Sequence, residues 1–268
     1  MQQAIAILDS GVGGLTVVRE VMRQLPQEKV IYFGDTLRTP YGPREANQVI
    51  LFTRQIVQYL NQFNPKMIVI ACNTATALAF DEIRSMVSVP VLGVIHPGAR
   101  AAIKMTRSGR VGVIGTENTV KSGAYEHALH AISPALEVTS QACPLLVPLV
   151  EKGMFRTAET SDAVKLSLSP LSTSSIDCLI LGCTHYPFLS DTIAEVMGPN
   201  VSLINSAEET AREISTILYH RGQLAATEAI PIHQLICSGE PTTFRQIALE
   251  WLGEHLKSSP VSWQVARL

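Results

Sequence analysis

The chain has 268 residues, enough for one large domain or two of ordinary size, and 46% of them are hydrophobic. Lysine and arginine together number 21 and aspartate and glutamate 23, without a basic run, which argues against nucleic acid as a partner. Apolar runs fall short of the roughly 18 residues of a membrane span, and five cysteines suit a reduced compartment better than a disulfide framework.

The first predicted unit is a strand at 4–8, a glycine-rich turn that begins with Asp9 and Ser10, and a helix at 15–24. No basic stretch precedes this strand, so we expect no secretory signal and a cytoplasmic protein. The glycine spacing is not G-x-G-x-x-G, so no dinucleotide site is indicated. The amides of a helix N-terminus favour an anion, but a plain tight turn would also explain the pattern.

A second strand at 30–33 leads to Asp35 and then to a stiff loop in which Tyr41 and Gly42 lie between two prolines. Such a loop is either a connector or a rigid support for ligand contacts. An amphipathic helix is expected at 46–61.

The two strongest signals are cysteines at the ends of buried strands. Cys72 follows an apolar strand at 67–71 and precedes Asn73, Thr74 and a helix. Cys183 likewise ends an apolar run that begins at residue 178, and Thr184 and His185 come next. The carboxyl ends of strands are where open α/β sheets bind ligands.

Further strands are expected at 89–95, 111–114, 200–204, 231–237 and 261–265. Helices are expected at 99–106, from residue 116 through 125, near 162–168, at 208–219 and at 242–252, and a loop or short helix at 144–151 ends in Glu151. We expect the C-terminal tail to pack back on the first domain.

The chain contains a divergent internal repeat. Leu8 aligns with Ile114, Cys72 with Cys183 and Val91 with Val201, at offsets of 106, 111 and 110 residues. Similar offsets in three strand-turn-helix units indicate duplication. We therefore predict an α/β protein with two pseudo-symmetric domains of mainly parallel strands, the first at 1–97 plus 208–268 and the second at 98–207. The active site is expected in the cleft between them.

Opposed cysteines permit three interpretations. In the first, they are buried structural residues, which is common for free cysteine. In the second, they are metal ligands with His185 as a third, although the local spacing of a zinc site is missing. In the third, they are an acid–base pair that acts on two faces of one carbon atom. Because an unperturbed thiol has a pKa near ~8.5, a helix N-terminus or a nearby cation makes a useful fraction thiolate at neutral pH. No flavin, pyridoxal or nicotinamide motif is present, so we expect no cofactor.

Several motifs together resemble those of the glutamate racemases, within the aspartate/glutamate racemase family, over nearly the whole chain. They are Asp9-Ser10-Gly11-Val12-Gly13-Gly14-Leu15, Pro40-Tyr41-Gly42-Pro43-Arg44, Ala71-Cys72-Asn73-Thr74-Ala75 and Leu181-Gly182-Cys183-Thr184-His185-Tyr186-Pro187. The chain departs from the usual pattern at Leu37 and Thr39, where the family has Ala and Cys.

The resemblance implies a cofactor-independent two-base racemase that supplies D-glutamate for bacterial peptidoglycan, and a homodimer. It implies that Cys72 is the base toward D-glutamate and Cys183 the base toward L-glutamate. Asp9, Asp35, Glu151 and His185 would assist catalysis. The implied substrate contacts are Asp9, Ser10, Tyr41, Gly42, Asn73, Thr74, Thr184 and His185; no metal is implied.

Three alternatives remain open on the sequence. Aspartate racemases and hydantoin racemases also use opposed cysteines, although His185 after Thr184 is more typical of the glutamate enzymes. A non-catalytic amino-acid-binding protein of the same fold is the third, and the presence of both cysteines argues against it.

Overall fold

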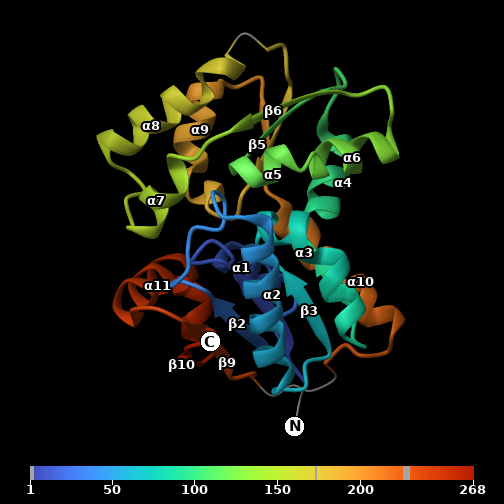
Figure 1. Ribbon diagram of the computed structural model, residues 1–268, viewed down its shortest axis with the longest axis vertical. Helices are drawn as coiled ribbons and strands as arrows, with labels where there is room; N and C mark the ends of the chain where they lie inside the picture. The colour runs from blue at the N-terminus through green and yellow to red at the C-terminus, as the bar shows by residue number, and fades with distance from the viewer. Residues whose placement is uncertain (1–2, 173, 226–229) are drawn as a thin grey trace.

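The computed structural model describes residues 3–172, 174–225 and 230–268 and has two parallel β-sheets in two lobes (Figure 1). The lower lobe holds a six-stranded sheet in the order β10-β9-β2-β1-β3-β4. Its strands are β1 (Ile5–Asp9), β2 (Val30–Gly34), β3 (Met67–Ile70), β4 (Val91–Gly93), β9 (His233–Cys237) and β10 (Val261–Val265). The upper lobe holds a four-stranded sheet in the order β6-β5-β7-β8. Its strands are β5 (Arg110–Gly115), β6 (Glu137–Ala142), β7 (Cys178–Gly182) and β8 (Ser202–Ile204).

The two sheets repeat one topology, as the sequence offsets predict. The order β2-β1-β3-β4 in the first sheet corresponds to β6-β5-β7-β8 in the second, and all the pairings are parallel. The tail adds β9 and β10 beyond β2, so the expectation that it packs back on the first domain is confirmed. The predicted fold class is likewise confirmed.

Helices connect and cover the strands. They are α1 (Leu15–Gln24), α2 (Ala46–Asn61), α3 (Asn73–Met86), α4 (Ile95–Met105), α5 (Glu117–Lys121), α6 (Ala124–Ile132), α7 (Leu146–Glu151), α8 (Ala158–Leu168), α9 (Ser190–Met197), α10 (Ser206–His220) and α11 (Pro241–Ser258), with short 3₁₀ turns η1 (Ser169–Leu171) and η2 (Tyr186–Leu189).

Alternation along the central strand β1 divides the core of the first lobe. Ile5 and Ile7 face the side of the sheet that α1, α10 and α11 cover, whereas Ala6 and Leu8 face the side that α2 and α3 cover. Because both faces are buried, the strand reads as an unbroken apolar run, as is typical of parallel sheets. The carboxyl ends of β1 and β3 face the other lobe, where Asp9 meets Thr184 and Thr74 meets Thr116.

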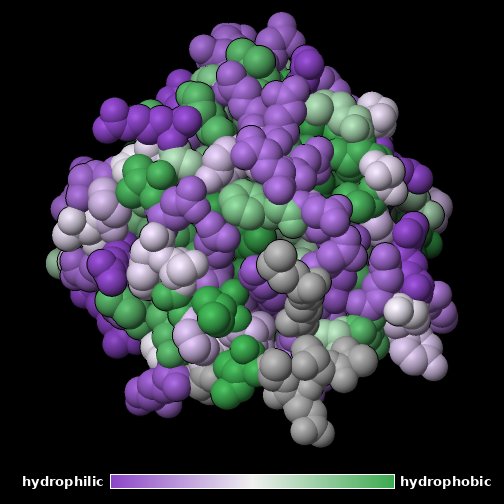
Figure 2. Space-filling model, turned by 90° about the horizontal axis from the view of Figure 1, so that it is seen from below, coloured by the Kyte–Doolittle hydropathy of each residue, from purple (hydrophilic) through white to green (hydrophobic). Residues whose placement is uncertain are grey.

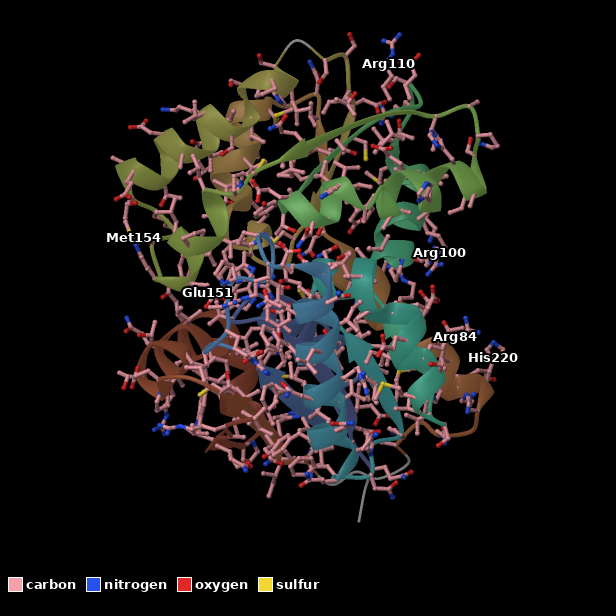
Figure 3. The ribbon with its side chains drawn as sticks, viewed as in Figure 1. Arg84, Arg100, Arg110, Glu151, Met154 and His220 are labelled. Atoms are coloured by element: carbon pink, nitrogen blue, oxygen red, sulfur yellow. The ribbon has the colours of Figure 1, made fainter. Side chains whose placement is uncertain are left out.

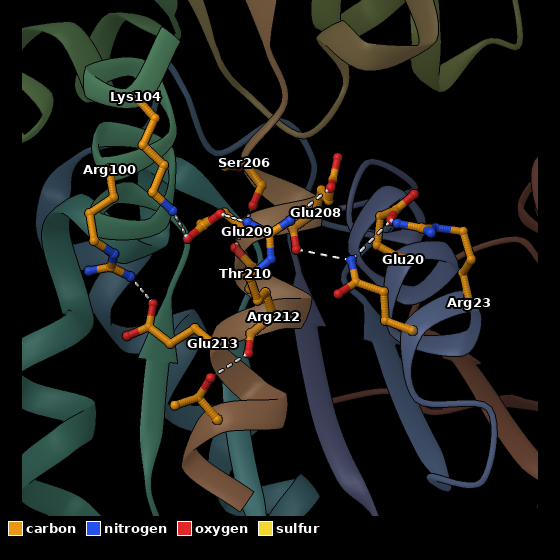
Figure 4. Close-up of polar contacts among 12 residues, drawn as sticks. Glu20, Arg23, Arg100, Lys104, Ser206, Glu208, Glu209, Thr210, Arg212 and Glu213 are labelled. Atoms are coloured by element: carbon orange, nitrogen blue, oxygen red, sulfur yellow. Dashed lines mark hydrogen bonds and ion pairs between the residues drawn. The ribbon is translucent and has the colours of Figure 1, made fainter. Parts of the chain in front are cut away.

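Helices α4 and α10 carry the chain between the lobes. Arg100 pairs with Glu213, Lys104 Nζ lies 2.9 Å from Glu209 Oε1, and Gln24 Nε2 of α1 donates to the Glu208 carbonyl at 3.1 Å (Figure 4). The predicted domain boundaries at 97/98 and 207/208 fall inside these two helices, and they stay a prediction.

Two element predictions were wrong in their bounds, and two elements were missed. The strand expected at 89–95 is only β4, because α4 already begins at Ile95; Pro97 is accommodated in its first turn, where an amide hydrogen has no helical partner. The helix expected through residue 125 is broken into α5 and α6 at Gly123, whose φ of 65° suits glycine. Strand β6 and helix α9 were not predicted.

No helix among the described residues is long and apolar enough to cross a membrane. On the face seen in Figure 2, hydrophobic residues are scattered among hydrophilic ones. That face therefore does not single out a dimer interface, and the homodimer stays a prediction.

Candidate active site

The carboxyl ends of the matching strands meet between the lobes and enclose one cavity that both cysteines line. Its walls are Ser10, Pro40, Tyr41, Gly42, Cys72, Asn73, Thr74, Thr116, Val147, Cys183, Thr184 and His185. The cavity has a volume of about 10 Å³, which is about what one water molecule needs. Its composition, and not its size, identifies it: a cleft of about 750 Å³ over α3, α4 and α10 contains neither cysteine.

Cys72 caps the N-terminus of α3 and is buried. Its Sγ accepts the Ala75 amide hydrogen at 3.4 Å and donates to Ser10 Oγ at 3.6 Å. Burial raises the pKa of the Cys72 thiol to about 12, and the negative charge of Asp9 adds to the rise. Cys72 is therefore a protonated thiol at neutral pH.

Cys183 has a different neighbour, the imidazole of His185. Cys183 Sγ lies 3.5 Å from His185 Nδ1, and His185 Nε2 lies 2.5 Å from Glu151 Oε1. Burial lowers the pKa of His185, but the negative charges of Cys183 and Glu151 and the hydrogen bonds to them outweigh it and raise this pKa well above its ordinary value. The group beside Cys183 is thus an imidazolium, the neighbour that stabilises a thiolate.

The glycine-rich turn after β1 explains how Glu151 reaches His185. The Val12 amide donates to Glu151 Oε1 at 2.9 Å, and a Cβ added at Gly11 would lie 1.8 Å from that oxygen. The anion at this helix start is therefore a carboxylate of the chain itself. Figure 3 shows Glu151 at the boundary between the lobes.

Asp9 lies directly behind the cavity wall and is fully buried. Its carboxylate accepts the Gly11 amide and the Thr184 hydroxyl, both at 3.0 Å. Burial raises the pKa of Asp9, and the positive charge of His185 opposes the rise. Asp9 thus fixes Thr184 across the lobe boundary.

Asp35 is also buried, but the structure does not bring it to the cavity. Its carboxylate accepts the Tyr41 hydroxyl, the Arg38 Nε at 2.6 Å and the Ser238 Oγ at 2.7 Å. Its contact with the site is through Tyr41, so a direct catalytic role for Asp35 stays a prediction of the family resemblance.

Hydroxyl groups form the wall beside α3. Thr74 Oγ1 lies 2.8 Å from Thr116 Oγ1, which lies 3.0 Å from Thr119 Oγ1. The sequence interpretation missed Thr116 as a site residue. The available signal was the repeat: Thr116 follows β5, the counterpart of β1, and at the offset of 106 residues it corresponds to Ser10.

Metal binding, the second interpretation of the cysteines, gains no support from the arrangement of the described residues. Among residues 3–172, 174–225 and 230–268, no group of three or more histidine, cysteine, aspartate or glutamate side chains could hold a metal ion.

Comparison with known proteins gives a consistent result. The family model for Asp/Glu/Hydantoin racemase matches residues 13–214. A glutamate racemase of Bacillus cereus is 50% identical over 258 residues, 96% of each chain. The crystal structure of a glutamate racemase isoform from Bacillus anthracis superposes with a TM-score of 0.92 at 48% identity over 97% of each chain. The crystal structure of the Francisella tularensis glutamate racemase in complex with D-glutamate superposes with a TM-score of 0.89 at 32% identity. That match covers 100% of this chain and 97% of the other. The chain therefore belongs to the Asp/Glu/hydantoin racemase family, among its glutamate racemases.

Proposed function

We propose that this protein interconverts L- and D-glutamate with Cys72 and Cys183 as two bases on opposite faces of the α-carbon. The observation that carries the proposal is that two pseudo-symmetric strand ends each contribute one buried cysteine to the same cavity. The similarity to glutamate racemases, one of them in complex with D-glutamate, supports glutamate as the ligand.

The surroundings of the cysteines suit opposite roles. In the L-to-D direction, the Cys183 thiolate removes the α-proton of L-glutamate, and the Cys72 thiol gives its proton to the other face of the carbanion. The products are D-glutamate, a Cys183 thiol and a Cys72 thiolate, and the D-to-L direction runs through the same states in reverse. The raised pKa of His185 favours its imidazolium form, and the raised pKa of Cys72 favours its thiol form, before L-glutamate binds.

The remaining wall supplies donors. Removing a proton next to a carboxylate generates dianionic character, which preorganised hydrogen-bond donors stabilise strongly. The proposed substrate contacts are Ser10, Tyr41, Gly42, Asn73, Thr74, Thr184 and His185, all of which line the cavity, and Asp9 behind Thr184. We propose that Glu151 holds His185 charged.

The proposed setting is the cytoplasm, with D-glutamate supplied for peptidoglycan and a homodimer as the working form. Aspartate is a poor substrate under this proposal, because donors placed for the longer side chain stay unpaired with the shorter one.

The test is circular dichroism of purified protein with each glutamate enantiomer in the presence of EDTA. We expect both to decay to the same racemic mixture, and aspartate to react at a small fraction of that kcat/KM. Activity that vanishes with EDTA and returns with metal would contradict the cofactor-free mechanism. Comparable kcat/KM for aspartate would contradict glutamate specificity, and absence of α-hydrogen exchange in deuterated water would leave a binding protein only.

A further inference from the structure

Tyr125, which the sequence interpretation did not single out, reaches the candidate site from the second lobe. It lies on α6, and its hydroxyl donates to Asn73 Oδ1 on α3 at 2.7 Å. Both side chains are only 2% exposed. The hydrogen bond therefore crosses the lobe boundary in a place without competing water.

The tyrosine hydroxyl has a second polar side chain next to it. Ser206 at the start of α10 lies beside Tyr125, because Ser206 Cβ and the Tyr125 hydroxyl would both lie 3.2 Å from a Cβ added at Gly98. Figure 4 shows Ser206 at that end of the helix. A phenol has a single proton. The Tyr125 hydroxyl gives that proton to Asn73 Oδ1, so toward any other neighbour its oxygen can only accept.

The other end of the Asn73 amide is unpaired. Asn73 lines the cavity, and its Nδ2 is a buried atom without a hydrogen-bond partner among the described residues. A buried donor without a partner costs free energy. Asn73 Nδ2 lies in the cavity that would receive the two carboxylates of the proposed substrate. A ligand carboxylate would satisfy it.

We propose that Tyr125 is a positioning residue that holds the Asn73 amide with its NH₂ group available to a substrate carboxylate. The two ends of an amide have nearly the same size. Without the tyrosine hydroxyl, a half-turn of the amide presents its oxygen to the carboxylate, where it repels instead of donating. This inference rests on the proposed function, because it requires a carboxylate ligand in the cavity.

The surroundings of the Tyr125 hydroxyl are tightly packed. A Cβ added at Gly98 would lie 3.2 Å from both the Tyr125 hydroxyl and Ser206 Cβ. Gly98 is in the first turn of α4, so the start of α4, the start of α10 and Tyr125 meet where the chain passes between the lobes. The orientation of Asn73 is thereby linked to the closed arrangement of the two lobes.

The experiment is a double-mutant cycle on kcat/KM for glutamate with Tyr125→Phe, Asn73→Ala and the double variant. We expect Tyr125→Phe to lower kcat/KM about tenfold or more, mainly through KM, on the scale of one hydrogen bond to a charged group. In the Asn73→Ala background the same change should have little further effect. Tyr59→Phe, which removes a hydroxyl that accepts from Gln264 far from the site, is the matched control.

Each outcome decides the matter. Equal losses from Tyr125→Phe in both backgrounds would overturn the inference and assign Tyr125 a structural role only. A Tyr125→Phe enzyme with the same kcat/KM for glutamate as Tyr59→Phe would also overturn the inference. If Tyr125→Phe does not fold, Ser206→Ala replaces it in the cycle and must show the same dependence on Asn73. If the wild-type protein does not racemise glutamate at all, the proposed function fails first.

Discussion

At the scale of single residues, the two cysteines are alike in sequence context and different in electrostatic surroundings. Cys72 lies near the carboxylate of Asp9 and hydrogen bonds to Ser10, whereas Cys183 lies next to an imidazole that Glu151 holds. Such a difference between paired groups is how one site assigns acid and base roles. It arises from long-range contacts, because Glu151 is 34 residues from His185.

His185 gives a prediction for stability against pH. Its folded-state pKa is raised above the ordinary value of 6.5, so its ion-pair contribution is fully present below that pH and is lost as pH rises through the folded-state pKa. The free energy of unfolding of wild type minus that of His185→Gln should therefore shrink as the pH rises above about 6.5 and through the folded-state pKa of His185. Urea unfolding at several pH values measures it.

The exposed histidine variant His127→Gln controls for the loss of any histidine. A wild-type advantage over His185→Gln that stays constant over this range would contradict the charged His185.

At the scale of elements, the turn between β1 and α1 is shaped by Glu151 of α7. Because a Cβ at Gly11 would lie 1.8 Å from Glu151 Oε1, we expect Gly11→Ala to displace that carboxylate, to lower kcat for glutamate and to destabilise the protein by about 1–3 kcal/mol. Chemical denaturation and steady-state rates on the same preparation measure both effects.

Gly253→Ala in α11 is the matched control. Nothing lies within 4 Å of a Cβ added there, so this change should stabilise by about 0.5–1 kcal/mol, the usual gain for alanine in a helix. A Gly11→Ala enzyme as active and as stable as Gly253→Ala would refute the role of the turn.

The elements around the cavity also close it. Asn118 Nδ2 of α5 donates to the Arg44 carbonyl at 2.7 Å, and the Asn118 amide donates to the Gly42 carbonyl at 3.3 Å. A Cβ added at Gly42 would lie 2.7 Å from Thr116 Cβ. A volume of about 10 Å³ does not admit glutamate, so we expect the cavity walls, including these contacts, to move when the substrate binds.

At the scale of the whole molecule, the repeat was the feature that the sequence predicted best. Apolar runs that end in Cys72 and Cys183 locate two strand ends, and near-equal offsets require those ends to occupy matching places in two sheets. Such strands can be recognised in the sequence, because parallel strands that are buried on both faces consist of continuous apolar runs.

The missed features depend on tertiary contacts. Strand β6, with the sequence EVTSQA, has no fully buried residue and no apolar run, so pairing with β5 determines it. Thr116 and Tyr125 join the site only because α3 of one lobe packs against the other lobe. Asp35 contacts Tyr41 from outside the cavity, and its part in catalysis stays a prediction of the family resemblance.

In the proposed mechanism each face of the α-carbon meets a different thiol. Replacing either cysteine with serine puts a hydroxyl, a much weaker acid than a thiol, in place of that base and should abolish racemisation. Elimination from an analogue with a β leaving group needs only one base. Only folded variants, with unfolding midpoints close to that of wild type, are compared.

The decisive measurement is therefore the elimination rate of each analogue enantiomer with Cys72→Ser and Cys183→Ser. We predict that Cys183→Ser processes the D-analogue and Cys72→Ser the L-analogue, each with little activity on the other enantiomer. Variants that treat both enantiomers alike, or a folded Cys72→Ser enzyme that racemises glutamate at near the wild-type rate, would contradict the two-thiol mechanism.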